Sequence, residues 1–183
     1  MEPTELRTER LLLRPFRMQD VEDVVAYGSD EAWQRYVAIV PQPYTRDDAV
    51  EWCELEATRD WSRDAVFAIE YDGTVVGATN LMLLLANEMA ELGYGMASRY
   101  WGQGIMPEAV TGLLDWAFPT YGLAKVAAKV DTRNERSWRM VERLGMTREG
   151  HLRKATLTHQ GDRRDEYVYG LLREEWESTR RPS

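Results

Sequence analysis

A strongly periodic apolar segment constrains the fold of this chain more than any other feature. Between residues 106 and 117, apolar side chains recur at i, i+3, i+4, i+7, i+8 and i+11, which predicts an amphipathic helix. Segments with strand character precede it (AELGYGM, 90–96) and follow it (AKVAAKV, 124–130). A helix between two such strands joins them as parallel neighbours through a right-handed crossover. The apolar positions of this helix are Met106, Ala109, Val110, Leu113, Leu114 and Ala117.

The rest of the pattern predicts mostly antiparallel strands around this unit. Residues 65–85 read as a hairpin, because the dipeptide Asp72-Gly73 between two alternating segments is a strong turn signal. Further strands are expected at 10–16, 147–157 and 164–172, and further helices at 18–29, 44–61 and 134–145. We therefore predict one α+β domain over residues 1–183, with a mixed, mostly antiparallel sheet of about seven strands flanked by helices.

The composition limits the class of protein to which this chain can belong. Hydrophobic residues make up 44% of the 183 residues and charged residues 30%, and no stretch approaches the ~18 consecutive apolar residues of a membrane span. The N-terminal residues are charged and lack the apolar core of a secretory signal. A single cysteine, Cys53, on the apolar side of the helix 44–61, excludes an internal disulfide. We expect a cytoplasmic protein with no membrane or nucleic-acid partner, because the net charge of −8 opposes nucleic-acid binding. That charge favours a cationic partner such as an amine, or serves solubility alone.

Two glycines stand between the strand 90–96 and the periodic helix. In RYWGQGIMPEA (99–109), Gly102 and Gly104 allow a sharp backbone turn, and Pro107 fits the first helical turn. A helix N-terminus offers unpaired N–H groups and a partial positive charge, so this turn suits a phosphate or pyrophosphate. It matches neither the nucleotide P-loop nor the dinucleotide fingerprint. On its own the turn is equally compatible with a tight strand-to-helix connection that binds nothing.

Three segments in order, AELGYGM, RYWGQGIMPEA and NERSWRMVERLGM, resemble the GNAT superfamily of acetyl-CoA-dependent N-acetyltransferases. The likeness is greatest to the bacterial ribosomal-protein N-terminal (alanine/serine) acetyltransferases, and it extends from TERLLLRPF to DEYVYGLLREEW. The resemblance implies a GNAT-type sheet whose central strand–helix–strand unit binds acetyl-CoA. One departure lies in the pyrophosphate loop, where Trp101 and Met106 occupy the first and last positions of the family pattern.

The resemblance also implies where acetyl-CoA would bind. The pyrophosphate would lie on backbone N–H groups of the turn. The pantetheine arm would lie between the splayed strands 90–96 and 124–130 and pair with their free backbone groups, where Gly93 and Gly95 leave room for it. Asn134 would bond the arm, and Ser137 would donate a proton or hydrogen bond to the departing sulfur. Alternatively, Asn134 and Ser137 only cap a helix, and the strand glycines only mark a β-bulge. The implied cofactor-binding residues are Tyr94, Gly95, Met96, Trp101, Gly102, Gln103, Gly104, Ile105, Met106, Asn134 and Ser137.

The acceptor side is less well marked. Glu91 is the candidate base, acting directly or through water, or else a solvated carboxylate. Thr156 occupies the position at which the ribosomal subgroup carries a catalytic glutamate. Trp33 and Tyr36 are candidate walls of the acceptor site, or else core residues. His151 and His159 lack metal-ligand spacing, so no metal is expected.

The implied reaction is acetyl transfer to a primary amine, with a protein N-terminal α-amine as the first candidate. Open alternatives are a small-molecule amine (polyamine, amino acid or aminoglycoside), a non-catalytic acyl-CoA-binding module, and an enzyme that binds a different phosphate compound. Because relatives are often dimers, a homodimer is a further expectation.

Overall fold

One eight-stranded sheet organises the chain. The structure, a computed structural model, describes residues 1–37, 40–158 and 161–180. Within these ranges the strand order is β1-β2-β3-β4-β5-β6-β8-β7, and only β5 and β6 are parallel neighbours. The mixed, mostly antiparallel sheet is thus confirmed, and β1 is the strand beyond the expected seven. The strands are β1 (Leu6–Arg7), β2 (Leu11–Arg14), β3 (Asp64–Tyr71), β4 (Thr74–Leu84), β5 (Met89–Met96), β6 (Lys125–Asp131), β7 (Thr147–Leu157) and β8 (Arg163–Leu172).

Six α-helices flank the sheet in the described parts of the chain. They are α1 (Val21–Gly28), α2 (Glu31–Gln34), α3 (Arg46–Ala57), α4 (Ile105–Tyr121), α5 (Glu135–Arg143) and α6 (Arg173–Arg180). Sequence periodicity missed two of them. α2 is a single turn, too short to show a period, and α6 is mostly charged, with Trp176 as its one buried residue.

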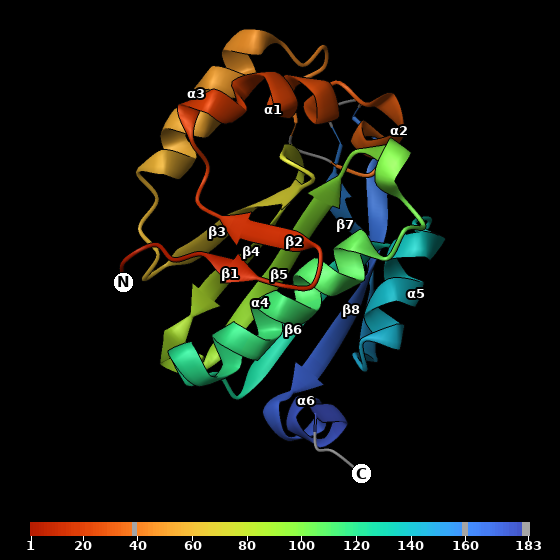
Figure 1. Cartoon of the computed structure of the whole chain (residues 1–183). Helices are drawn as coiled ribbons and strands as arrows, with labels where there is room; N and C mark the ends of the chain where they lie inside the picture. The colour runs from red at the N-terminus through yellow and green to blue at the C-terminus, as the bar shows by residue number, and fades with distance from the viewer. Residues whose placement is uncertain (38–39, 159–160, 181–183) are drawn as a thin grey trace.

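The helices form two layers, one on each face of the sheet. In β3, Phe67 belongs to the apolar cluster that includes α4 and α5, whereas its neighbour Ala68 belongs to the cluster that includes α1 and α3. This alternation follows from the period of two in a strand. We call these two sides the α4 face and the α1 face. In Figure 1, α4 lies in front of the sheet, and α1 and α3 lie side by side at the top.

The predicted central unit is confirmed. All six predicted apolar positions of α4 are buried, and the helix begins after Gly104 and ends before Gly122. Both glycines have positive φ, +78° and +65°. The turn Asp72-Gly73 also lies in the left-handed region, as the predicted hairpin requires. Cys53 is fully buried and unpaired, which agrees with its predicted place in the core.

No helix in the described ranges is long and apolar enough to cross a membrane. Among the same residues, no group of three or more His, Cys, Asp or Glu side chains could hold a metal ion. His151 pairs with Asp165 at 2.9 Å, and His159 lies outside the described residues.

Candidate active site

β5 and β6 part from each other near the middle of the sheet. Their parallel ladder pairs residues 89–92 of β5 with residues 125–128 of β6, and ends at Leu92 and Ala128. β5 nevertheless continues to Met96, still paired on its other side with β4, and β6 continues to Asp131. We call the space between residues 93–96 and 129–131 the opening. Among the described residues, the backbone groups of β5 that point into it have no strand partner, so an extended ligand could pair with them.

The glycine turn lies just beyond the end of β5. Gly102 and Gly104 have φ of +77° and +78°, and the turn runs directly into α4. Within the described chain, five consecutive backbone N–H groups, from Gly102 to Met106, have no intramolecular acceptor. The N–H of Trp101, also expected to be a donor, is instead bonded to the carbonyl of Ser98 at 3.0 Å. Five free donors at the start of a 17-residue helix make a site for an oxyanion.

Side chains hold this turn in shape without using its free N–H groups. The indole Nε1 of Trp101 donates to the carbonyl of Met96 at 2.9 Å, and the amide of Gln103 donates to the carbonyl of Arg99 at 2.9 Å. Arg10, from the chain just before β2, donates to the carbonyl of Gln103 at 3.0 Å. Trp101 and Gln103 thus contribute side chains that support the turn. This role explains how Trp101 can occupy the first position of the loop while the backbone remains available.

Two hydroxyl groups meet beside the opening on the α4 face. The Oγ of Ser137, on α5, lies 2.6 Å from the hydroxyl of Tyr94, on β5. Burial raises the pKa of Tyr94 to about 12, although the hydrogen bond to Ser137 opposes this, so the phenol stays protonated at neutral pH. Asn134 has the capping role: its side chain accepts from the N–H of Ser137 at 3.2 Å. The hydroxyl of Ser137 does not cap α5 and is hydrogen-bonded to Tyr94 instead.

On the α1 face, Trp33 covers the opening. A Cβ added to Gly95 would lie 2.4 Å from the indole Nε1 of Trp33, so only glycine permits this contact. Asp30 fixes the position of α2, because its carboxylate accepts from the N–H groups of Ala32 and Trp33 and from that of Ser98.

The β4–β5 ladder runs without irregularity past Gly93 and Gly95, so the bulge interpretation is wrong. The space left by Gly93 is filled by Asn80 of β4.

Polar side chains continue along the α1 face beyond the opening. Glu91 bonds the ammonium of Lys129 at 2.8 Å, and this hydrogen bond raises the pKa of Lys129. Thr156 donates a short hydrogen bond to the carboxylate of Glu166, on β8. Thr156 is the position at which the resemblance leads us to expect a glutamate, and the carboxylate of Glu166 lies beside it, supplied by β8 and not by β7. Sequence alignment missed Glu166 because the register between β7 and β8 shifts between Leu152 and Thr156.

Tyr36, the other predicted wall of the acceptor site, follows α2. Its backbone N–H donates to the carbonyl of Trp33 at 3.0 Å, and its hydroxyl lies near enough to Arg133 to influence the pKa of that guanidinium. Arg133 follows β6 directly. Tyr36 thus stands at the same end of the opening as the residues that follow β6.

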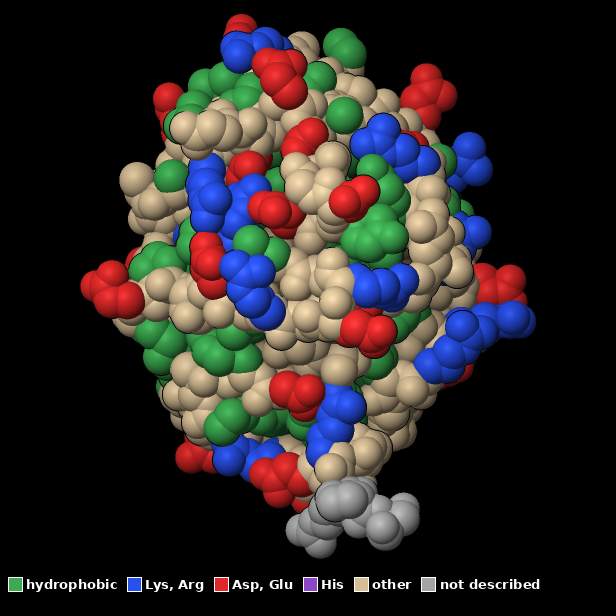
Figure 2. Space-filling model, in the orientation of Figure 1, with side chains coloured by type: hydrophobic (Ala, Val, Ile, Leu, Met, Phe, Trp, Pro, Cys, Tyr) green, Lys and Arg blue, Asp and Glu red, His purple; other side chains and the backbone are tan. Residues whose placement is uncertain are grey.

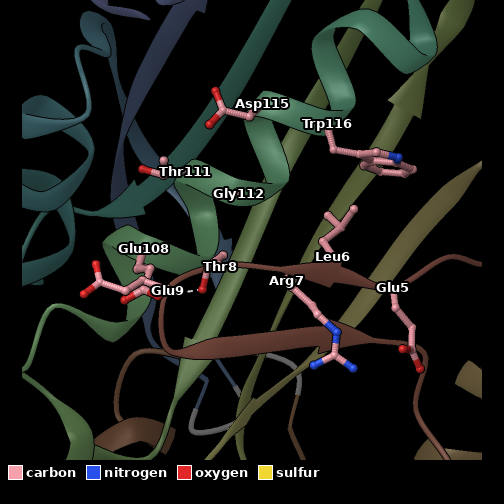
Figure 3. A pocket seen from close by; sticks show the side chains of 10 residues that line it. All are labelled: Glu5, Leu6, Arg7, Thr8, Glu9, Glu108, Thr111, Gly112, Asp115 and Trp116. Carbon is pink, nitrogen blue, oxygen red and sulfur yellow. Dashed lines mark hydrogen bonds between the residues drawn. The ribbon is translucent and has the colours of Figure 1, made fainter.

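A separate hollow of about 610 Å³ lies between β1 and α4 (Figure 3). Its Glu108 is already occupied, by Thr8 at 2.5 Å and by Arg10 at 2.7 Å. None of the predicted site residues lines this hollow, and we assign it no function. Figure 2 shows acidic and basic side chains interspersed over this side of the molecule, without an extended field of one sign. The hollow is lined by Glu5, Leu6, Arg7, Thr8, Glu9, Glu108, Thr111, Gly112, Asp115 and Trp116.

Known proteins are similar to this chain in sequence and in fold. The acetyltransferase (GNAT) domain family matches residues 10–147. The uncharacterized N-acetyltransferase p20 of Bacillus licheniformis is 30% identical over 174 residues, covering 93% of this chain and 97% of that protein. A candidate ribosomal-protein-serine acetyltransferase of Vibrio cholerae is 25% identical with a TM-score of 0.80, covering 94% of this chain and 99% of that one. Mycobacterium smegmatis RimJ, solved in complex with CoA-disulfide, is 25% identical with a TM-score of 0.81, covering 96% and 91%.

Proposed function

The chain belongs to the acetyltransferase (GNAT) family and is an N-acetyltransferase with acetyl-CoA as donor, and from this premise we propose that its acceptor is the N-terminal α-amine of a peptide or protein. The observation that carries the proposed site is the parting of β5 and β6 next to five free N–H groups of the glycine turn. The likeness to the Vibrio cholerae protein supports the choice of acceptor.

The donor half of the site fits coenzyme A. The free N–H groups between Gly102 and Met106 would bind the pyrophosphate, helped by the dipole of α4. The unpaired edge of residues 93–96 would bond the amides of the pantetheine arm, with Tyr94 and Gly95 alongside it. When bound, acetyl-CoA supplies an acyl thioester whose sulfur leaves as a thiolate.

Ser137 and Tyr94 would protonate that sulfur. Ser137 donates a proton toward the leaving group, and Tyr94 can replace it across their 2.6 Å hydrogen bond. Because its pKa is raised to about 12, Tyr94 carries its proton at any physiological pH. The pair would therefore act as a short proton relay from the α4 face.

The carboxylates on the α1 face are already hydrogen-bonded, which favours an α-amine over a lysine side chain as the acceptor. Glu91 is tied to Lys129, and Glu166 accepts from Thr156, so neither carboxylate is an unengaged base. An α-amine, with a reference pKa of ~7.7–8.0, is already partly neutral at pH 7, whereas lysine, at ~10.4, is not. We propose that Glu91, directly or through water, accepts the proton, and that Glu166 is the second carboxylate on the α1 face.

The acceptor is tested by mixing the purified protein with acetyl-CoA and following the release of free thiol. The panel contains peptides with free α-amines, the same peptides N-blocked but containing lysine, polyamines, amino acids and aminoglycosides. Ser137→Ala is the control for enzyme-dependent release. Turnover of the free α-amine peptides alone supports the proposal, and turnover of only small-molecule amines or blocked peptides refutes it.

The expected homodimer remains a proposal. β7 is an outer strand of the sheet in the described ranges, and Leu152 and Leu157 on it are 42% and 56% exposed. A second copy could pair along this edge. Light scattering on the eluted protein would distinguish a dimer from a monomer.

A further inference from the structure

The buried donors without acceptors lie on the α1 face of the sheet. Among the described residues, four buried side-chain nitrogens lack a hydrogen-bond partner: Nε1 of Trp33, Nε1 of Trp52, and Nε and Nη1 of Arg164. Buried polar groups are normally paired, so each exception calls for a physical explanation. Trp33 is already a predicted wall of the acceptor site, but neither sequence pattern nor the proposed chemistry accounts for Arg164.

Arg164 is the second residue of β8 and lies on the α1 face. Tyr169 and Leu171 of the same strand belong to the apolar cluster of the α4 face, and side chains alternate along β8. Arg164 therefore shares the α1 face with Glu166. Its side chain is only 10% exposed, and burial lowers the pKa of its guanidinium.

Among the described residues, no carboxylate accepts a hydrogen bond from Nε or Nη1 of this guanidinium. The nearest, Asp131, lies 3.5 Å from Nη1 of Arg164 but makes no hydrogen bond to it. The carboxylate of Asp131 is instead bonded by Arg133, whose backbone N–H, Nε and Nη2 lie 2.9, 3.0 and 2.8 Å away. Asp162 is exposed and acts on Arg164 only through its charge. Burying a charged group with so few hydrogen bonds costs free energy, and an oxyanion bound to the guanidinium would reduce that cost.

The register of the sheet places Arg164 relative to the reaction. Val168 is opposite Lys129, the first residue of β6 beyond its paired segment, and Glu166 is opposite Asp131. The backbone of Arg164 is four residues from Val168, about 13 Å toward the open end, but its guanidinium reaches back to within 3.5 Å of Asp131, which is two residues, about 7 Å, beyond Lys129. An extended peptide advances by about 3.5 Å per residue. A ligand whose amine reacts where the strands part would thus pass Arg164 with its third or fourth residue.

We propose that Arg164 binds an acidic side chain, an aspartate or glutamate, at the third or fourth position of the acceptor peptide. This inference rests on the proposed N-terminal acceptor and names its class: peptides with an early carboxylate. Arg164 acts as a specificity residue, because its guanidinium lies beside Asp131 at the far end of the opening, about 7 Å along β6 from the point where the strands part. A carboxylate matches the planar donor fork of an arginine and would give both buried nitrogens an acceptor.

The test uses peptides with a free α-amine that differ only in carrying glutamate or glutamine at positions three and four. With the wild-type protein we expect the glutamate peptides to have a KM about 10- to 100-fold lower, with little change in kcat. Arg164→Gln should abolish this difference by raising the KM of the glutamate peptides alone, and Arg164→Lys should retain part of it. Arg163→Gln is the matched control, because Arg163 is the exposed neighbour on the opposite face and should leave the preference intact.

Several results would overturn the inference. Equal KM values for both peptides with the wild-type protein do so without any variant, and so does a preference that survives in Arg164→Gln. If no peptide is acetylated, the proposed function fails, and calorimetric titration of the same peptides in the presence of coenzyme A decides the role of Arg164 separately. Tighter binding of the glutamate peptides that depends on Arg164 supports it, and equal or undetectable binding refutes it.

Discussion

Replacing Gly102 by alanine separates the conformational role of the glycine turn from its role in binding. Gly102 has φ of +77°, and a Cβ added there would meet no atom within 4 Å, so the substitution strains the backbone without a clash. Gly73, in the β3–β4 turn, has φ of +74° and equally open surroundings. Alanine in this left-handed region costs about 1–2 kcal/mol. For a chain of this size we expect both variants to lose about 2–8 °C in Tm.

Only Gly102→Ala should weaken coenzyme A binding. Relaxing the strained φ turns at least one free N–H group of the turn away from the pyrophosphate. A hydrogen bond to a charged group contributes about 1.5–3 kcal/mol, so we expect Kd to rise roughly 10- to 100-fold. Isothermal titration calorimetry with coenzyme A measures this for the wild type and both variants. Unchanged affinity in Gly102→Ala, or an equal loss in Gly73→Ala, would refute the placement of the pyrophosphate.

Three further predictions concern the proposed catalytic hydroxyl groups and the buried cysteine. Ser137→Ala should lower kcat about 100-fold with an almost unchanged Tm, because Asn134 caps α5; full activity in stopped-flow thiol release would contradict its role. Tyr94→Phe should lower kcat by a factor that stays constant from pH 6 to about 10, since the raised pKa of Tyr94, about 12, keeps the phenol protonated throughout. If the kcat of the wild type fell at alkaline pH and that of this variant did not, the phenol would titrate in this range and the prediction would be wrong. Burial raises the pKa of Cys53 to about 11, so disulfide reagents should label it about 100-fold more slowly than a free thiol, and rapid labelling of the native protein would show that this site opens.

Local features of the chain were readable from sequence. The period of α4, the Asp72-Gly73 turn and the strand before Gly102 depend on residues within a few positions of one another, and all appear in the structure as expected. α2 and α6 were missed for the opposite reason. One is too short for a period and the other buries a single side chain, so tertiary packing rather than sequence pattern holds each in place.

The same distinction between local sequence and tertiary packing applies to the site. Sequence alone predicted which strand, turn and helix would form the donor half, and it predicted Gly102, Gly104 and Ser137 as members of the site, because the roles proposed for them follow from local backbone geometry and a contiguous motif. Only the tertiary structure decided that Tyr94 bonds Ser137, that Trp33 rests on Gly95, and that Glu166 stands beside Thr156. In the described part of the chain it also left Nε and Nη1 of Arg164 without a hydrogen-bond partner. These contacts join elements far apart in the chain and depend on strand register, where a shift of one residue moves every side chain to the other face of the sheet.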